Sequence, residues 1–366
     1  MSPSHTLRSR HTRGTPRHHA LACAAALVLA VAPLAWAQQD APSGTPASID
    51  PALESLRTEA VALAPIVKSP AVRELLDAVP SLPGVEATTI YYRRGVTPRE
   101  VYSQEAYDAL PEETRAELSP IQISTARYYV TFYGSPLASM RLFDLAAQAS
   151  HLQTFNGLRV LDYGFGSIGQ LELLAMCGAN VVGIEVEPIL QKFYEPRGLN
   201  RDVTGPNHTG HLRMLFAQWP GPHGEVSLDA GHDLDLFVSK NTLKRGYVRP
   251  REEAPAGSTI DLGVSPEAFL AAVHDALKPG GMLVIYNIGG APPAEGEPYS
   301  PMTDIASPWT RAEYESAGFE VLTFDADDSA AIRDCARALG WEQPPYSMDL
   351  EHDLFARCTI ARRSAG

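Results

Sequence analysis

The chain has 366 residues, of which 45% are hydrophobic and 20% are charged. These values are ordinary for a globular protein and exclude a wholly disordered chain, while the length allows one large domain or two unequal ones. The formal net charge is −13 at pH 7. A negative field of this kind repels phosphate backbones and anionic lipid, so we expect no nucleic-acid partner.

The N-terminal segment has the pattern of a bacterial signal peptide. Four arginines and no acid precede the apolar run Ala20–Ala32, and Ala35-Trp36-Ala37 supplies the small residues that a signal peptidase accepts. We predict that residues 1–37 are removed and that the mature protein is periplasmic or secreted. The apolar run is shorter than the roughly 20 residues that span a bilayer, so no stable membrane anchor is expected after cleavage.

The mature chain divides into three predicted parts. Residues 38–49 are small and polar, which is typical of a flexible linker. Residues 50–120 form an N-terminal accessory region, with helices expected near 51–63 and 70–78 and a strand near 87–92. Residues 121–366 alternate short apolar runs with helical stretches, which indicates βαβ units and a parallel sheet. The strands expected there are 159–163, 180–185, 212–216, 235–239, 282–287, 320–325 and 354–362.

A glycine-rich stretch carries the chemical signal. Residues 160–169 read VLDYGFGSIG, in which an apolar strand runs into Gly164, Gly166 and Gly169 and then into an apolar helix. Glycines let a ligand approach the backbone closely, and Glu185 lies at a spacing suited to a ribose diol. Asp162 favours S-adenosyl-L-methionine over NAD, because a carboxylate can face an ammonium group but not a pyrophosphate.

This stretch resembles the first motif of the class I S-adenosylmethionine-dependent methyltransferases. Residues 277–285, LKPGGMLVI, resemble the element that leads into the fifth strand of that family. The resemblance covers about residues 121–366. It implies an α/β, Rossmann-like fold with a seven-stranded, mostly parallel sheet closed by an antiparallel hairpin, to which residues 50–120 would add a mainly helical extension.

The resemblance also implies roles for individual residues. The three glycines would line the cofactor, Asp162 would lie near its ammonium group, and Glu185 would hold both ribose hydroxyls. Four further residues are expected at the cofactor, namely Gln218, Trp219, Ser239 and Tyr133. Asn241 would orient a nucleophile, and Lys240 would be a base if its pKa were lowered.

The predicted function is methyl transfer from S-adenosyl-L-methionine to an unidentified small-molecule or protein acceptor. One alternative is a non-catalytic protein that binds the same cofactor, since that cofactor is made in the cytosol and the chain is expected to be exported. A less favoured alternative is an NAD-dependent oxidoreductase. No metal is expected, because the eleven histidines and the cysteines lack ligand spacing.

Overall fold

The computed structural model describes residues 50–95, 99–131, 134–255, 257–294, 296–344 and 346–364. The predicted signal peptide, residues 1–37, and the predicted linker, residues 38–49, lie outside the described residues, and so does Tyr133. None of the described helices has the length and apolar character needed to cross a lipid bilayer.

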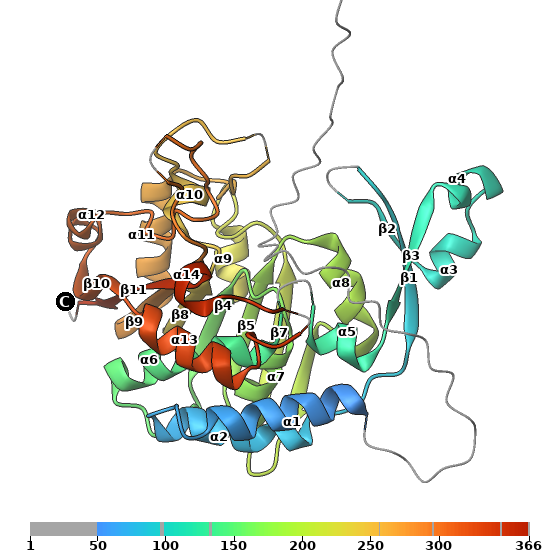
Figure 1. Cartoon of the computed structure of the whole chain (residues 1–366), viewed down its shortest axis with the longest axis horizontal. Coiled ribbons are helices and arrows are strands. Elements are labelled where there is room, and N and C mark those ends of the chain that lie inside the picture. The colour runs from blue at the N-terminus through green and yellow to red at the C-terminus, as the bar shows by residue number, and fades with distance from the viewer. Residues whose placement is uncertain are drawn as a thin grey trace, which may run out of the picture.

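The core of the molecule is a mixed sheet with strand order β10-β11-β9-β8-β4-β5-β7-β6 (Figure 1). Neighbouring strands from β9 to β7 in this order run parallel, whereas β11 is antiparallel to both β9 and β10. This confirms the predicted parallel sheet and its closing antiparallel hairpin. The strands are β4 (Arg159–Tyr163), β5 (Asn180–Glu185), β6 (Asn200–Thr204), β7 (Thr209–Phe216), β8 (Leu234–Lys240), β9 (Leu277–Gly289), β10 (Phe319–Asp327) and β11 (Phe355–Arg363).

The sheet has eight strands rather than the predicted seven. The additional strand is β6, which pairs antiparallel with β7 at the edge of the sheet. Its sequence, NRDVT, buries only Val203, so it lacks the apolar run by which the other strands can be recognised. The count of seven was wrong because an edge strand is held by backbone pairing more than by buried side chains.

Helices cover both faces of the sheet because successive strand residues point to opposite sides. Val160, Val181 and Leu236 pack on one face, whereas Leu161 and Phe237 pack on the other. The first face carries α6 (Met140–Ser150), α7 (Gly169–Met176), α8 (Pro188–Tyr194) and α13 (Ser329–Ala338), and the second carries α9 (Glu225–Ala230), α11 (Pro266–Ala276) and α12 (Arg311–Ser316). Shorter elements are η2 (Pro136–Ser139), η3 (Glu195–Arg197), α10 (Arg245–Val248) and α14 (Leu350–Asp353).

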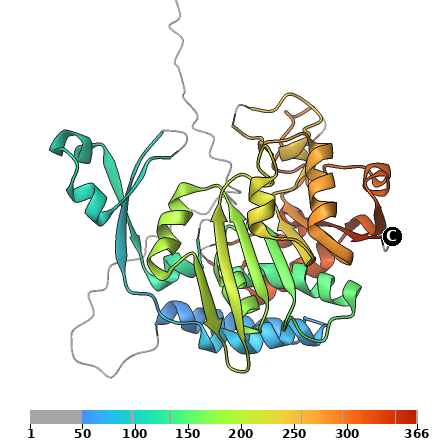
Figure 2. The ribbon, with the colours of Figure 1, turned by 180° about the vertical axis from the view of Figure 1, so that it is seen from behind.

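The N-terminal region contains a small sheet in addition to its predicted helices. Figures 1 and 2 show the two long helices along the bottom of the molecule and the small sheet projecting from its side. The strand β3 crosses the predicted boundary at 120/121 because all its residues pair with β1. The elements are α1 (Pro51–Leu63), α2 (Pro70–Ala78), η1 (Val79–Ser81), β1 (Thr88–Arg93), β2 (Val101–Ser103), α3 (Gln104–Asp108), α4 (Glu112–Ala116), β3 (Leu118–Ile123) and α5 (Thr125–Tyr129).

Candidate functional site

The candidate site lies where the strand order of the sheet reverses. The chain passes from β4 outward to β5 and β7 and then returns to β8 on the other side of β4. In open α/β sheets, ligands bind beyond the carboxyl ends of the strands at such a point. Asp162 and Gly164 at the end of β4, Glu185 at the end of β5 and Lys240 at the end of β8 all occupy this edge.

The three glycines of the loop have different structural roles. Gly164 and Gly166 adopt left-handed backbone conformations with φ of 71° and 62°, which residues other than glycine rarely adopt. Gly169 begins α7, and a Cβ there would collide with Pro136. Its small size therefore serves helix packing, while the first two glycines shape the loop.

Glu185 joins the end of β5 to the glycine loop. Its carboxylate accepts hydrogen bonds from the backbone N–H groups of Gly166 at 3.2 Å, Val186 at 2.8 Å and Glu187 at 3.3 Å. Burial raises the pKa of Glu185, and these N–H donors oppose that shift. Val186 is 65% exposed, which leaves an apolar side chain open to a ligand beside the carboxylate.

Asp162 is buried beside a lysine. Gln170 donates to its carboxylate at 3.3 Å and also to the Phe165 carbonyl at 2.7 Å. Burial raises the pKa of Asp162 to about 7, partly offset by Gln170 and by the positive charge of Lys240. Burial in turn lowers the pKa of Lys240 to about 8, and the charge of Asp162 opposes that shift. Both groups thus titrate near neutral pH.

The two ends of the site fit a nucleoside cofactor unequally. Glu185 and the exposed Val186 suit a ribose and a flat base. At the other end, the positive charge of Lys240 already acts on Asp162, and Thr242 donates to the Gly164 carbonyl at 3.4 Å while its side chain fills the space beside that glycine. An ammonium group at Asp162 would therefore meet a resident cation.

Two of the expected cofactor residues are engaged within the protein, one by burial and the other by a hydrogen bond. Trp219 is fully buried among Tyr163, Phe237 and Phe269, so it is part of the core rather than a stacking platform for a base. Gln218 donates to the Asp261 carbonyl at 2.8 Å. This bond ties the end of β7 to the loop that precedes α11.

The residues that follow β8 are engaged within the protein. Asn241 has φ of 65°, and its side-chain oxygen accepts the Ile288 N–H at 2.6 Å, which links β8 to β9. Ser239 is fully buried, and its hydroxyl has no hydrogen-bond partner among the described residues. Among the residues at the end of β8 and just after it, Thr242 touches the glycine loop at Gly164, and the charge of Lys240 acts on Asp162 beside that loop.

Sequence reasoning missed the burial of Lys244. This side chain is fully buried, and its ammonium group donates to the Ile288 carbonyl at 2.5 Å. Burial, together with the charge of Lys240, lowers the pKa of Lys244 to about 7. No local pattern indicates this burial, because the residues that contact the Lys244 ammonium group, Ile288 and Met302, lie far along the chain.

Comparison with known proteins adds a partial likeness. No protein-family model matches the chain, and no curated protein matches it by sequence. The cyclase SpnF is 21% identical with a TM-score of 0.37, over 62% of this chain and 81% of its own. A putative sarcosine dimethylglycine methyltransferase from Galdieria sulphuraria is 12% identical with a TM-score of 0.36, over 61% and 85%. For the magnesium protoporphyrin IX methyltransferase from Synechocystis PCC 6803 the values are 13% and 0.32, over 62% and 83%.

The strand order, rather than these likenesses, confirms the fold that the sequence motifs imply. A parallel sheet that reverses at β4 and closes with the antiparallel β11 gives the chain the fold of the class I S-adenosylmethionine-dependent methyltransferases. The glycine loop and Glu185 lie at the reversal point, as the sequence motifs predict.

Proposed function

We propose that this protein binds S-adenosyl-L-methionine at the carboxyl ends of β4 and β5 and transfers its methyl group to an acceptor. The observation that best supports this is the hydrogen bond from the Gly166 N–H to Glu185 at 3.2 Å. It brings the glycine loop and the acidic residue together at the edge where this fold binds ligands.

The residues at this edge suit the nucleoside half of that cofactor. One oxygen of Glu185 accepts the Gly166 N–H and has a lone pair left for a ribose hydroxyl, since an ionised carboxylate offers about four acceptor sites. The exposed side chain of Val186 offers an apolar contact to the adenine ring. At the other half, the ammonium group of the cofactor would lie within the influence of the Lys240 charge as well as that of Asp162.

The chain's own residues would then orient the acceptor and move a proton. The bound cofactor supplies a methyl group on a sulfonium, which a nucleophile takes in line while the sulfur keeps the electron pair. Lys240, with a pKa of about 8, can accept a proton near neutral pH once its ammonium form has lost its own. We therefore propose Lys240 as the base wherever the acceptor atom carries a proton.

Calorimetry with S-adenosyl-L-methionine tests the binding. We expect the wild-type protein to bind and Glu185→Ala to bind at least about tenfold more weakly, because a hydrogen bond to a charged group contributes roughly 1.5–3 kcal/mol. Glu195→Ala is the matched control, since Glu195 pairs with Lys192 on the surface of the same face. Equal affinity in Glu185→Ala and wild type would refute the proposed site.

A non-catalytic binding protein is the second candidate, and the commitment of Asn241 to the Ile288 N–H favours it. Mass spectrometry of small molecules released from the purified protein would show whether it carries the cofactor or its demethylated product. The demethylated product would support turnover. NAD in the same extract, or tighter binding of NAD in calorimetry, would favour an oxidoreductase instead.

Export remains part of the proposal. The signal-peptide pattern supports a mature chain that begins at Gln38 in the periplasm or outside the cell. N-terminal sequencing of protein from the native host tests this. A cytosolic chain that retains residues 1–37 would contradict export, and it would also remove the problem of supplying the cofactor outside the cytosol.

A further inference from the structure

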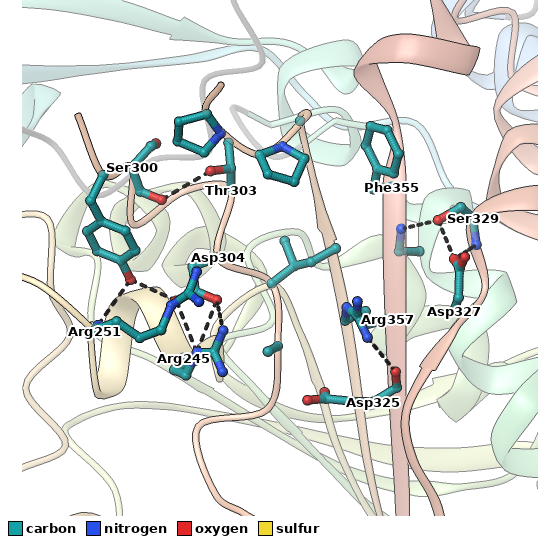
Figure 3. A pocket seen from close by; sticks show the side chains of 17 residues that line it. Arg245, Arg251, Ser300, Thr303, Asp304, Asp325, Asp327, Ser329, Phe355 and Arg357 are labelled. Atoms are coloured by element: carbon teal, nitrogen blue, oxygen red, sulfur yellow. Dashed lines mark hydrogen bonds and ion pairs between the residues drawn. The ribbon is translucent and has the colours of Figure 1, made fainter. Parts of the chain in front are cut away.

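A cavity lies beside the candidate cofactor site, and none of the residues that line it belongs to that site. Its volume is about 410 Å³, which is within the range of small-molecule sites. It opens beyond the carboxyl ends of β8 and β9, where the residues after Gly289 meet the start of β11 and the end of β10 (Figure 3).

One short turn separates this cavity from the glycine loop. Thr242 in that turn packs on Gly164, and three residues later Arg245 lines the cavity. The turn is held from the cavity side, because the Arg245 N–H donates to the Ala306 carbonyl at 2.8 Å and the Gly246 N–H to the Asp304 carbonyl at 3.1 Å. A molecule in the cavity would therefore lie next to the strand end at which the methyl group is expected.

The wall formed by this turn carries an excess of positive charge. Asp304 is nearly buried, with its side chain 4% exposed, and receives the Arg245 guanidinium at 2.7 Å and the Tyr299 hydroxyl at 2.8 Å. Arg251 reaches the same carboxylate at 3.3 Å, while its side chain is 62% exposed. Two guanidinium groups thus share one carboxylate, which leaves Arg251 able to pair with an anion.

The opposite wall carries one negative charge in excess, because Asp325 and Asp327 line it together with a single cation, Arg357. Arg357 and Asp327 are paired residues of β11 and β10, so their charges offset one another. Arg357 also donates to the Asp325 carbonyl at 2.8 Å, and the Asp325 carboxylate accepts the Ser307 N–H at 2.7 Å. Figure 3 shows these residues across the cavity from Arg245 and Asp304. Apolar lining comes from Pro292, Pro293, Ile305 and Phe355.

From this geometry we infer that the cavity binds the methyl acceptor, and that the acceptor is a small molecule with an acidic group and an apolar body. The acidic group pairs with Arg251, and the apolar body lies against Phe355 and the two prolines. This inference rests on the proposed methyl transfer. We infer a small molecule rather than a protein as the acceptor, because charged walls bound the cavity on opposite sides and its volume of about 410 Å³ suits a compact ligand.

Binding of three matched probes tests the inference. Phenylacetate, phenylacetamide and phenethylamine share one ring and differ in charge, and ligand-observed NMR gives their affinities for the full chain at low salt. We expect phenylacetate to bind at least about tenfold more tightly than the amide, as for a charge-assisted hydrogen bond. Equal affinity for acid and amide, or preference for the amine, would overturn the inference.

Three variants locate the binding. Arg251→Gln should weaken phenylacetate at least about tenfold and leave phenylacetamide unchanged. Arg311→Gln is the matched control, since Arg311 is also about half exposed but lies on α12 outside the cavity. Ser300→Phe fills the cavity from its lining and should remove binding of both probes. Retained binding in Ser300→Phe, with an unchanged melting temperature, would overturn the inference.

Calorimetry with S-adenosyl-L-methionine on the same preparations separates this inference from the proposed function. If the cofactor binds and phenylacetate does not, the acceptor assignment fails while cofactor binding stands. If phenylacetate binds in the cavity and the cofactor does not bind, the cavity is a ligand site but not an acceptor site, and the inference also fails. Binding of both, with the expected response of Arg251→Gln, supports it.

Discussion

Asn241 stabilises the junction between β8 and β9 in this structure. In Asn241→Ala the buried Ile288 N–H loses its partner, and alanine tolerates the positive φ poorly. We expect the free energy of unfolding to fall by about 1–3 kcal/mol, measured by urea denaturation. Asn241→Asp keeps an acceptor oxygen and should lose less. If the Asn241→Ala protein is as stable as wild type but cannot transfer methyl groups, that result would instead support a catalytic role for Asn241.

The left-handed backbone at Gly166 predicts a binding defect. Gly166→Val combines a positive φ with a β-branched side chain, so the loop whose N–H donates to Glu185 should distort and S-adenosyl-L-methionine binding should be lost. Gly296→Val is the matched control, because Gly296 also has a positive φ but has open space around it. Calorimetry should find the control's affinity unchanged. Equal losses in both variants would mean that backbone strain acts through global stability alone.

Burial of Lys244 predicts a pH dependence of stability. Its pKa is lowered from 10.5 to about 7 in the folded protein, so between these values the unfolded chain binds the extra proton. The contribution of Lys244 to stability should therefore rise with pH from about 7 to 10. In urea denaturation, the free energy of unfolding of wild type should rise relative to that of Lys244→Met over that pH range. Lys192→Met, at a partly exposed lysine of α8, is the control, and parallel pH profiles of wild type and Lys244→Met would contradict the prediction.

For individual residues, the sequence predicts those site features that depend on neighbours close in the chain. Asp162, Gly164 and Gly166 lie within a few residues of one another, and Glu185 follows one helix later, so their spacing alone indicates a site. The environment of Lys244 depends on Ile288 and Met302, which are 44 and 58 residues further along the chain. No local pattern reveals such a contact.

Helix α7 carries a buried charge network that fastens the N-terminal region to the core. Glu172 is buried, accepts the Tyr129 hydroxyl at 2.9 Å and the Tyr128 hydroxyl at 3.4 Å, and pairs with Arg201 of β6. Tyr129 is therefore a core residue that contacts α7, and it does not close the candidate site.

Removing that carboxylate should destabilise the protein strongly. Glu172→Leu leaves the Arg201 guanidinium largely buried without its partner, and breaking a buried pair in this way costs roughly 3–5 kcal/mol. Because Arg201 retains some exposure, we expect a loss near 3 kcal/mol in urea denaturation. Glu320→Leu removes an exposed pair with Arg362 and should change stability by less than about 1 kcal/mol. Similar losses in the two variants would contradict the role of burial.

The inner strands of the central sheet, β4, β5, β8 and β9, were predictable because they are largely buried and appear as apolar runs. The residues of α1 and α2 were predictable from proline at the first helical turn after Asp50 and Ser69, whose side chains cap the two helices. By contrast, β2 is three residues long with no buried residue, and β3 contains Pro120. Short or proline-containing edge strands give no periodic signal.

For the molecule as a whole, the N-terminal helices belong to the same hydrophobic core as α6 and α7. A chain lacking residues 50–82 would expose the surfaces that Leu56, Leu63 and Leu75 cover, and we expect it to be insoluble.

Replacing residues 104–117 with a Gly/Ser linker of about eight residues, long enough to cross β1, should leave the melting temperature nearly unchanged. The helices in that segment, α3 and α4, bury no residue.

Soluble yield and thermal melting measure both deletions. A soluble, cooperatively melting protein without residues 50–82 would show that the accessory region is dispensable for folding. Loss of solubility on removing residues 104–117 would show that α3 and α4 contribute more to folding than their exposure suggests.

The strand that hydrophobic periodicity misses also governs how copies of the protein meet. An open sheet edge presents unpaired N–H and C=O groups to any passing strand, and long apolar edges of that kind lead to aggregation. Here β6 forms the edge with Asn200, Asp202 and Thr204 exposed and with a single buried side chain. Pairing two such edges would bring identical carboxylates together and bury little apolar surface. The polar composition that hides β6 from sequence analysis therefore disfavours pairing between the edges of two copies.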